Sequence, residues 1–135
     1  MLDLLHIENI AIIEQADIAF RPGFNALTGE TGAGKSIVID ALSAVLGQRA
    51  SRELIRTGAD HAFVSAVFSH IPEGLGEDLG VADAQEWLLQ REIYTDGKNV
   101  CRCNGRPMTV TQLRTLGSRL LNIHGQHDGP QLLDE

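Results

Sequence analysis

The stretch GETGAGKS at residues 29–36 constrains the fold of this chain more than any other feature. It matches the pattern G-x-x-x-x-G-K-[ST] through Gly29, Gly34, Lys35 and Ser36. Glycines permit backbone angles that turn successive N–H groups inward, so such a loop forms an anion-binding nest at the positive end of the following helix. Lys35 can then reach the β and γ phosphates of a nucleotide, and the Ser36 hydroxyl can ligate Mg²⁺. The motif therefore predicts a nucleotide-binding α/β fold.

The flanks of this loop have the order strand, glycine loop, helix that the motif requires. Residues 2–10 and 14–20 are apolar with partial alternation and are expected to form an antiparallel pair. FNALTG at residues 24–29 is a short apolar strand that leads into the loop, and SIVIDALSAVLG at residues 36–47 is a helix that ends at Gly47. Kinases, switch GTPases and ATPases all hold phosphates in this way, so the loop alone does not identify a reaction.

Residues 60–105 are predicted to be mostly antiparallel sheet. HAFVSAVFSH suits a strand, and WLLQREIYT and KNVCRCNG form a hairpin through Thr95, Asp96 and Gly97. The single tryptophan, Trp87, is interpreted as a packing residue.

The last part of the chain is predicted to contain a helix and a strand. Thr109 or Thr111 is expected to cap a helix that runs to about Ser118. RLLNIHG at residues 119–125 is expected to be a final strand.

The composition restricts the partners of the chain. A formal charge of -7 and a pI near 5.1 argue against a surface that clings to nucleic acid everywhere, although a local basic patch can exist on one face. No window reaches the roughly 18 apolar residues that span a bilayer, so no membrane partner is expected and a cytoplasmic location is the default. Cys101 and Cys103 lie on one face of a predicted strand without disulfide geometry, so they are expected to be reduced.

Two long stretches together resemble the RecN family of bacterial DNA repair proteins, which are relatives of the SMC proteins. They are LHIENIAIIEQADIAFRPGFNALTGETGAGKSIVIDALSAVLGQRA and GRPMTVTQLRTLGSRLLNIHGQHD. The most specific parts are the phosphate loop with its flanks, IRTGAD, NGRPMT and NIHGQHD, and their order fits the first part of that family's ABC-type head. The resemblance covers nearly the whole chain.

The resemblance implies an α/β P-loop NTPase of the ABC/SMC head type, of which this chain is the N-terminal part with an antiparallel β subdomain. Such heads are split in sequence by a long antiparallel coiled coil. The implied division assigns residues 1–48 to strands, phosphate loop and helix, residues 49–108 to a mainly antiparallel β region, and residues 109–135 to helix, strand and glutamine loop. The coiled coil and the C-terminal head segment are absent from the sequence.

Gln126 in HGQHD matches the glutamine that, in such heads, ligates Mg²⁺ and helps to place the attacking water. The resemblance therefore implies Lys35 and Gln126 as catalytic residues, and Ser36 and Gln126 as Mg²⁺ ligands. The implied ATP-binding residues are Gly29, Glu30, Thr31, Gly32, Ala33, Gly34, Lys35, Ser36, Ile37 and Arg56.

Such heads also use a signature loop, which caps the ATP of the partner head, and a buried Walker B strand that ends in Asp-Glu. The sequence shows no signature loop. LLDE at residues 132–135 has only two apolar residues before Asp134, too few for the Walker B strand. Phosphoryl transfer needs a positioned water and charge stabilisation as well as a phosphate cradle. The full-length protein is therefore expected to hydrolyse ATP, whereas this chain alone is expected to be nearly or wholly inactive.

The resemblance also implies partners. They are the C-terminal head segment of the same protein, a second head in a homodimer closed around ATP, and DNA at double-strand breaks in the full-length protein. The implied location is cytoplasmic and nucleoid-associated. The role on DNA rests on the resemblance alone.

Several charged and thiol groups leave alternatives open. Three arginines after the predicted helix form either nucleotide or DNA contacts or a solvated basic face, with Arg56 the best single candidate. The other two are Arg49 and Arg52. A modest DNA-facing patch around the hairpin would consist of Lys98, Arg102 and Arg106. A zinc site is disfavoured because CxC followed by HxxH differs from the usual ligand pairs; it would use Cys101, Cys103, His124 and His127.

Two rival functions use the same phosphate loop. A small-molecule kinase would need an acceptor pocket and a mobile lid that carries an arginine. A nucleotide-gated dimerisation module would join two heads through ATP without turnover. The antiparallel insertion after the loop suits an ABC-type head better than a kinase.

Overall fold

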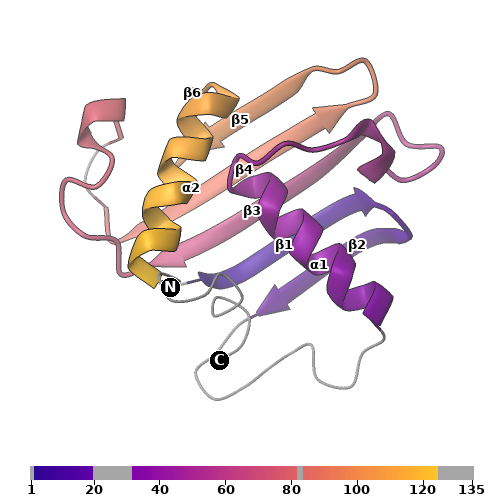
Figure 1. The fold of residues 1–135 in the computed structure, drawn as a ribbon, viewed down its shortest axis with the longest axis horizontal. Coiled ribbons are helices and arrows are strands. Elements are labelled where there is room, and N and C mark those ends of the chain that lie inside the picture. The colour runs from indigo at the N-terminus through magenta and orange to yellow at the C-terminus, as the bar shows by residue number, and fades with distance from the viewer. Residues whose placement is uncertain (1, 20–31, 82–83, 125–135) are drawn as a thin grey trace.

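The computed structural model describes residues 2–19, 32–81 and 84–124, with the side chains of residues 32–35 and 123–124 outside that description. One six-stranded sheet has the order β2-β1-β3-β4-β5-β6, and every neighbouring pair is antiparallel. Helices α1 and α2 both lie on one face of this sheet (Figure 1). The elements are, in chain order, β1 Leu2–Ile10, β2 Ile13–Ala19, α1 Gly32–Val45, η1 Arg52–Leu54, β3 His61–Ser69, η2 Glu77–Leu79, β4 Glu86–Tyr94, β5 Asn99–Cys103, β6 Arg106–Met108 and α2 Val110–His124.

The predicted strand pairs are confirmed. β1 and β2 form an antiparallel hairpin, and β4 and β5 form the second hairpin. The turn of the second hairpin closes with a hydrogen bond from the Tyr94 amide to the Lys98 carbonyl, and Gly97 supplies the left-handed backbone with φ 96°. The predicted strand at residues 24–29 lies outside the described residues. The short strand β6 was not predicted, because Pro107 and three residues carry too little pattern to indicate a strand.

The core lies between the sheet and the two helices. In β3 and β4 every second residue is buried, so one face of each strand is apolar and is covered by the helices. Trp87 is 1% exposed, which confirms its packing role. Among the described residues, no helix combines the length and the apolar character that a membrane crossing requires.

The end of α1 follows from its sequence. Gly47 has φ 88°, its amide donates to Ala44, and the Gln48 amide donates to Ser43. These two bonds form a Schellman motif, in which a glycine in the left-handed conformation satisfies the last helical carbonyls. The predicted helix end at Gly47 is therefore confirmed, although the helix begins at Gly32 rather than Ser36.

α2 corrects one prediction. It runs from Val110 to His124, so the prediction of a final strand at residues 119–125 is wrong for residues 119–124. Thr109 starts the helix through a capping box, because its hydroxyl accepts from the Gln112 amide and the Gln112 side chain accepts from the Thr109 amide. Apolar side chains at helical spacing then extend the helix past Ser118. They are the fully buried Leu113, Leu116 and Leu120.

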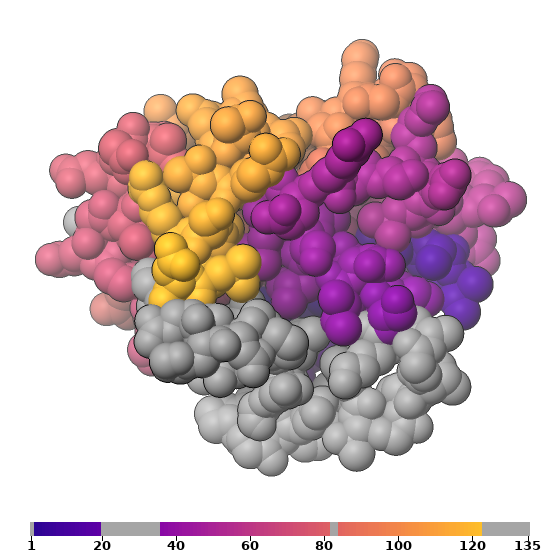
Figure 2. All heavy atoms as spheres, in the orientation of Figure 1, coloured from indigo at the N-terminus to yellow at the C-terminus, as the bar shows by residue number. Residues whose placement is uncertain are grey.

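The two helices touch through glycines. A Cβ atom at Gly117 of α2 would lie 2.3 Å from the Leu46 carbonyl oxygen, and a Cβ at Gly47 would lie 2.3 Å from the Arg114 amide nitrogen. Only glycine allows the backbones to approach this closely. Arg114 adds a hydrogen bond from Nε to the Gly47 carbonyl at 3.1 Å. The C-terminal end of α1 is therefore fixed directly against α2, and the helices lie side by side on the surface (Figure 2).

The opposite face of the sheet carries a histidine between two carboxylates. His6 on β1 bonds Asp17 on β2 through Nδ1 at 2.5 Å and Glu8 through Nε2 at 2.6 Å. The ring also lies edge-on to Phe63 of β3. Burial lowers the pKa of His6, but the hydrogen bonds and negative charges of Glu8 and Asp17 outweigh burial, so the pKa lies above its ordinary value.

We predict that Gly117→Ala lowers the free energy of unfolding by about 2 kcal/mol, because the added methyl group overlaps the Leu46 carbonyl. At an ordinary helix position, alanine stabilises the helix by about 1 kcal/mol relative to glycine. A loss of stability would therefore show that the added methyl group meets the Leu46 carbonyl. Urea denaturation measures it. The matched control is the exposed neighbour Ser118→Ala, which should be neutral or slightly stabilising. An equally stable Gly117→Ala chain would contradict the close contact.

We also predict a pH-dependent contribution from His6. Because its pKa is raised by folding, the protonated ring stabilises the fold below its unfolded value of about 6.5, and this contribution is lost as pH rises through the folded value. The stability difference between the wild type and His6→Asn should therefore shrink as the pH rises above about 6.5. In a Glu8→Gln, Asp17→Asn background this pH dependence should be nearly absent, and its persistence there would exclude these carboxylates as the cause.

Candidate functional site

The phosphate-loop motif continues into the first turn of α1. The helix begins at Gly32, inside the motif, so its first amides belong to the glycine-rich sequence. The first turn of α1 contains no acidic residue, so no carboxylate of the helix competes for those amides. Of the predicted nucleotide-binding residues, Gly29, Glu30 and Thr31 lie outside the described residues.

Two predicted site residues on α1 have described side chains. Ser36 is exposed. Ile37 is half-buried and packs against the core, so its side chain supports the helix. The backbones of Gly32, Ala33, Gly34 and Lys35 lie in the first turn of α1, whereas Gln126 lies outside the described residues.

The other end of α1 is held by a buried arginine that the sequence analysis did not single out. Arg91 on β4 is 3% exposed, and its Nη1 donates to the carbonyl oxygens of Ala44 and Gln48 at 2.7 and 2.6 Å. Its Nε donates to the Asn99 side chain at 2.9 Å. Burial lowers the pKa of Arg91 from its ordinary value, yet arginine stays protonated in proteins. A positive charge therefore lies at the negative end of the α1 dipole.

A sequence signal for Arg91 existed. In WLLQREIYT the residues at alternate positions face the core, and Arg91 is the charged member of that series. Charged side chains are almost never fully buried unless they are paired. An arginine in an inward position of an alternating strand therefore indicates buried polar partners, here the end of the phosphate-loop helix.

Arg56 has a fixed backbone and an unsatisfied side-chain atom. Its amide donates to the Asn9 carbonyl at 2.8 Å, next to a bridge between Ile10 and Ile55. Its Nε is buried and has no hydrogen-bond partner within the described part of the chain. A buried guanidinium donor without a partner is costly, so Nε of Arg56 can donate a hydrogen bond to an anionic group.

The neighbouring arginines are placed differently. Arg52 donates to the Thr95 carbonyl at 3.2 Å and is exposed. Arg49 lines a cavity of about 430 Å³ between α1 and the segment that follows it. Both acidic and basic groups line this cavity, which is bounded by Ala11, Asp40, Ser43, Arg49, Ala50, Ser51, Glu53 and Leu54. The three arginines therefore have different surroundings.

The basic hairpin residues and the cysteines lie on the far half of the sheet. Lys98 and Arg106 are exposed and Arg102 is half-buried, on or next to β5 and β6. Cys101 and Cys103 are buried and carry no disulfide bond within the described part of the chain. Burial raises the pKa of both thiols, that of Cys103 to about 11, so both stay protonated at neutral pH. Protonated buried thiols pack as small apolar groups.

Comparisons with known proteins identify the family of the chain. A model of the AAA domain family matches residues 4–99. The DNA repair protein RecN of Bacillus subtilis (strain 168) is 44% identical over 140 residues, covering 100% of this chain and 24% of that protein. The DNA repair protein RecN of Vibrio cholerae is 43% identical over 138 residues, covering 98% of this chain and 25% of that protein. The chain thus spans about a quarter of the length of these relatives.

A solved structure from work on ATP-driven dimerization and DNA-stimulated activation of SMC ATPases has the same arrangement. It superimposes with a TM-score of 0.71 at 26% identity and covers 99% of this chain and 91% of that one. The predicted fold class, a P-loop head portion of the SMC type with an antiparallel sheet, is therefore confirmed.

We predict that Arg91→Met lowers the free energy of unfolding by about 3 kcal/mol, because it removes three hydrogen bonds and leaves the Ala44 and Gln48 carbonyls without their charged donor. Arg91→Lys should be intermediate, since a single ammonium group cannot replace the planar fork. Guanidinium denaturation measures both variants. Arg102→Met, on the next strand and half-buried, is the control and should change stability by less than about 0.5 kcal/mol. Equal losses of stability in Arg91→Met and Arg102→Met would contradict the role of Arg91 in holding the end of α1.

Proposed function

The chain belongs to the AAA domain family and is a RecN-type segment of an ATPase head, and from that premise we propose that residues 29–37 bind the triphosphate of ATP together with Mg²⁺. In this proposal Lys35 contacts the β and γ phosphates, and Ser36 and Gln126 ligate the ion. Arg56 supplies a further donor to the nucleotide. Gln126 also places the attacking water, so Lys35 and Gln126 are the catalytic residues of this segment.

The observation that carries the proposal is the start of α1 inside the phosphate-loop motif. A 14-residue helix begins at Gly32, its first turn has no acidic side chain, and its other end is already satisfied by Arg91 and Gly47. The amides at the start of such a helix, together with the helix dipole, attract an anion. Lys35 and Ser36, the last two residues of the motif, are of the types that bind a triphosphate and its Mg²⁺.

The activity of the whole protein extends this proposal. ATP is hydrolysed by in-line attack of water when two heads close around two nucleotides, and the C-terminal head segment supplies the Walker B and signature elements. The dimer is supported by the similar SMC structure, which comes from work on ATP-driven dimerization. The relatives are DNA repair proteins, which supports action on DNA double-strand breaks in a cytoplasmic, nucleoid-associated setting. The chain alone binds ATP without appreciable turnover.

We predict that Lys35→Ala raises the Kd for Mg·ATP by about tenfold or more, because a charge-assisted bond to phosphate contributes about 1.5–3 kcal/mol. Isothermal titration calorimetry on the chain measures this. The chain has one other lysine, Lys98, in the exposed turn between β4 and β5, and Lys98→Ala should bind ATP as the wild type does. Wild-type chain that is folded but releases no heat with Mg·ATP would contradict the proposal.

The same pair of variants separates the rival functions. The chain is mixed with the C-terminal head segment of a RecN protein, and phosphate release is measured. Hydrolysis that disappears with Lys35→Ala supports the split head. Transfer of phosphate to an added small acceptor supports a kinase, whereas association of the two parts with ATP bound but no hydrolysis supports a dimerisation module.

A further inference from the structure

The cavity of about 430 Å³ beside α1 is built from three parts of the chain. Asp40 and Ser43 of α1 form its first wall. Residues 49–51 and 53–54, in the segment that contains η1, form its second wall. Ala11, in the turn between β1 and β2, also lines it. This turn and the η1 segment lie at the same end of the sheet (Figure 1).

Backbone hydrogen bonds hold the second wall and the β1–β2 turn in place. The Ala11 amide donates to the Leu54 carbonyl at 2.8 Å, and Ala11 has the left-handed backbone with φ 52°. The Ile55 amide closes η1 by donating to the Arg52 carbonyl at 3.1 Å. Nη1 of Arg52 donates to the Thr95 carbonyl, in the turn between β4 and β5, at 3.2 Å. A partner that binds here therefore meets a preformed surface, which lowers the entropy cost of binding.

Two exposed isoleucines border this cavity. Ile12 is 79% exposed and follows Ala11 in the chain, and Ile39 is 40% exposed and precedes Asp40. No other described large hydrophobic side chain is as exposed as these two. Apolar side chains that are exposed together, next to a concave surface with polar groups, indicate a site of contact with another molecule.

The charged groups around the cavity form no salt bridge with a described residue. Asp40 places a negative charge on the first wall. Arg49 places a positive charge on the second wall, and Arg52 lies in the same segment. Glu53 is a further carboxylate of the second wall. The surface therefore carries two charges of each sign, and they are open to a partner.

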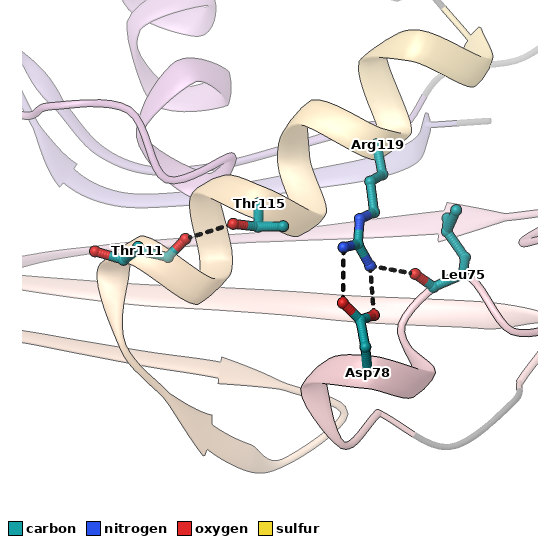
Figure 3. Close-up of polar contacts among 5 residues, drawn as sticks. All are labelled: Leu75, Asp78, Thr111, Thr115 and Arg119. Carbon is teal, nitrogen blue, oxygen red and sulfur yellow. Dashed lines mark hydrogen bonds and ion pairs between the residues drawn. The ribbon is translucent and has the colours of Figure 1, made fainter.

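The pair on α2 shows the opposite case, in which an arginine meets its carboxylate within the chain. Arg119 donates through Nη1 and Nη2 to the two carboxylate oxygens of Asp78 at 2.8 and 2.9 Å (Figure 3). Its Nη1 also donates to the Leu75 carbonyl at 2.7 Å. At the cavity the opposite charges stand on separate walls, so that a second molecule is needed to pair them.

We propose that the cavity with its two bordering isoleucines binds a second copy of the same chain, with the two-fold axis passing through the cavity. In a symmetric dimer the same patch of both copies meets, so that a contact from one residue to another is repeated in reverse. A two-fold rotation places the Asp40 wall of one copy against the Arg49 wall of the other, and two ion pairs form. A partner of one charge sign would leave one wall unmatched. The surface supplies its own complement.

This contact goes beyond the closure of two heads around ATP. The described lining of the cavity begins on α1 at Asp40, four residues after Ser36. Association through it therefore needs no nucleotide and should persist in Lys35→Ala. Because the interface is small, we expect a weak dimer with a Kd of about 1–100 µM. Its ion pairs are exposed at the rim, so added salt should weaken it.

Sedimentation velocity of the chain without nucleotide tests the proposal. The wild type should pass from monomer to dimer as its concentration rises through this range. Asp40→Arg and Arg49→Asp should each raise the Kd of the dimer by about tenfold or more, because the two-fold axis repeats each change. Glu73→Arg is the matched control and should leave the Kd unchanged. It reverses an exposed charge in the connection between β3 and β4, at the other end of the sheet.

A mixture of the two charge-reversal variants separates a direct contact from an indirect effect. An Asp40→Arg copy has arginine at both positions 40 and 49, and an Arg49→Asp copy has aspartate at both. The mixed dimer therefore contains two attractive pairs, whereas each variant alone contains two repulsive pairs. The mixture should form dimers about as well as the wild type does. Failure of the mixture to associate, with both variants folded by circular dichroism, would overturn the proposal.

The apolar part is tested independently by Ile12→Ser and Ile39→Ser, each of which should weaken the dimer about fivefold or more. A wild-type chain that stays monomeric at about ten times the expected Kd range would overturn the proposal. A dimer that none of the four changes weakens would also overturn it, because another face would then form the contact. A monomeric chain that binds the C-terminal head segment of a RecN protein through Ile39 would assign the surface to that segment instead. Loss of ATP binding in calorimetry would leave these results unchanged.

Discussion

The fixed C-terminal end of α1 is the constraint on which the rest of the molecule depends. Arg91 reaches this end from the sheet and donates to two of its carbonyls, and the backbone of α2 presses against it at Gly47. The buried charge of Arg91 is tolerated because each of its described hydrogen bonds goes to an oxygen atom that needs a donor. With one end satisfied inside the protein, the first amides of the helix lie at the other end, inside the phosphate-loop motif.

Three charged clusters in the described part of the chain differ in burial, and burial decides their roles. Arg91 is buried and sets the position of a helix, so its loss affects folding. Arg119 is half-buried and Asp78 is exposed, so their bond adds less to stability than the buried bonds of Arg91 do. His6 lies on the sheet face opposite the helices, between Glu8 and Asp17, and its contribution depends on pH. The ATP proposal uses the first cluster only, because Arg91 contacts the helix that begins inside the phosphate-loop motif.

Much of the fold could be predicted from local sequence, and the failures have physical causes. The hairpin at Thr95–Gly97, the strand pair before the loop and the end of α1 at Gly47 each rest on turn or capping chemistry, which acts over a few residues. The continuation of α2 past Ser118 was missed because RLLNIH suits a strand locally, whereas the leucines of the whole helix bury one continuous face. The glycine contact between α1 and α2 joins residues that are 67 to 71 positions apart in the sequence, and Arg119 and Asp78 are 41 positions apart. No local pattern indicates such distant pairs. For the site, the phosphate loop was evident from its motif, but the role of Arg91 appears only once β4 lies beneath α1.

The central claim is the proposal that residues 29–37 hold the triphosphate of ATP and that Ser36 and Gln126 ligate the same Mg²⁺. A crystal structure of the chain with Mg²⁺ and a non-hydrolysable ATP analogue tests it most directly. The account predicts the phosphates at the first turn of α1, with the oxygens of Ser36 and Gln126 both about 2.0–2.1 Å from one Mg²⁺. A nucleotide bound away from Gly32–Ser36, or a Mg²⁺ that Ser36 ligates while Gln126 points elsewhere in a closed, fully liganded site, would contradict it.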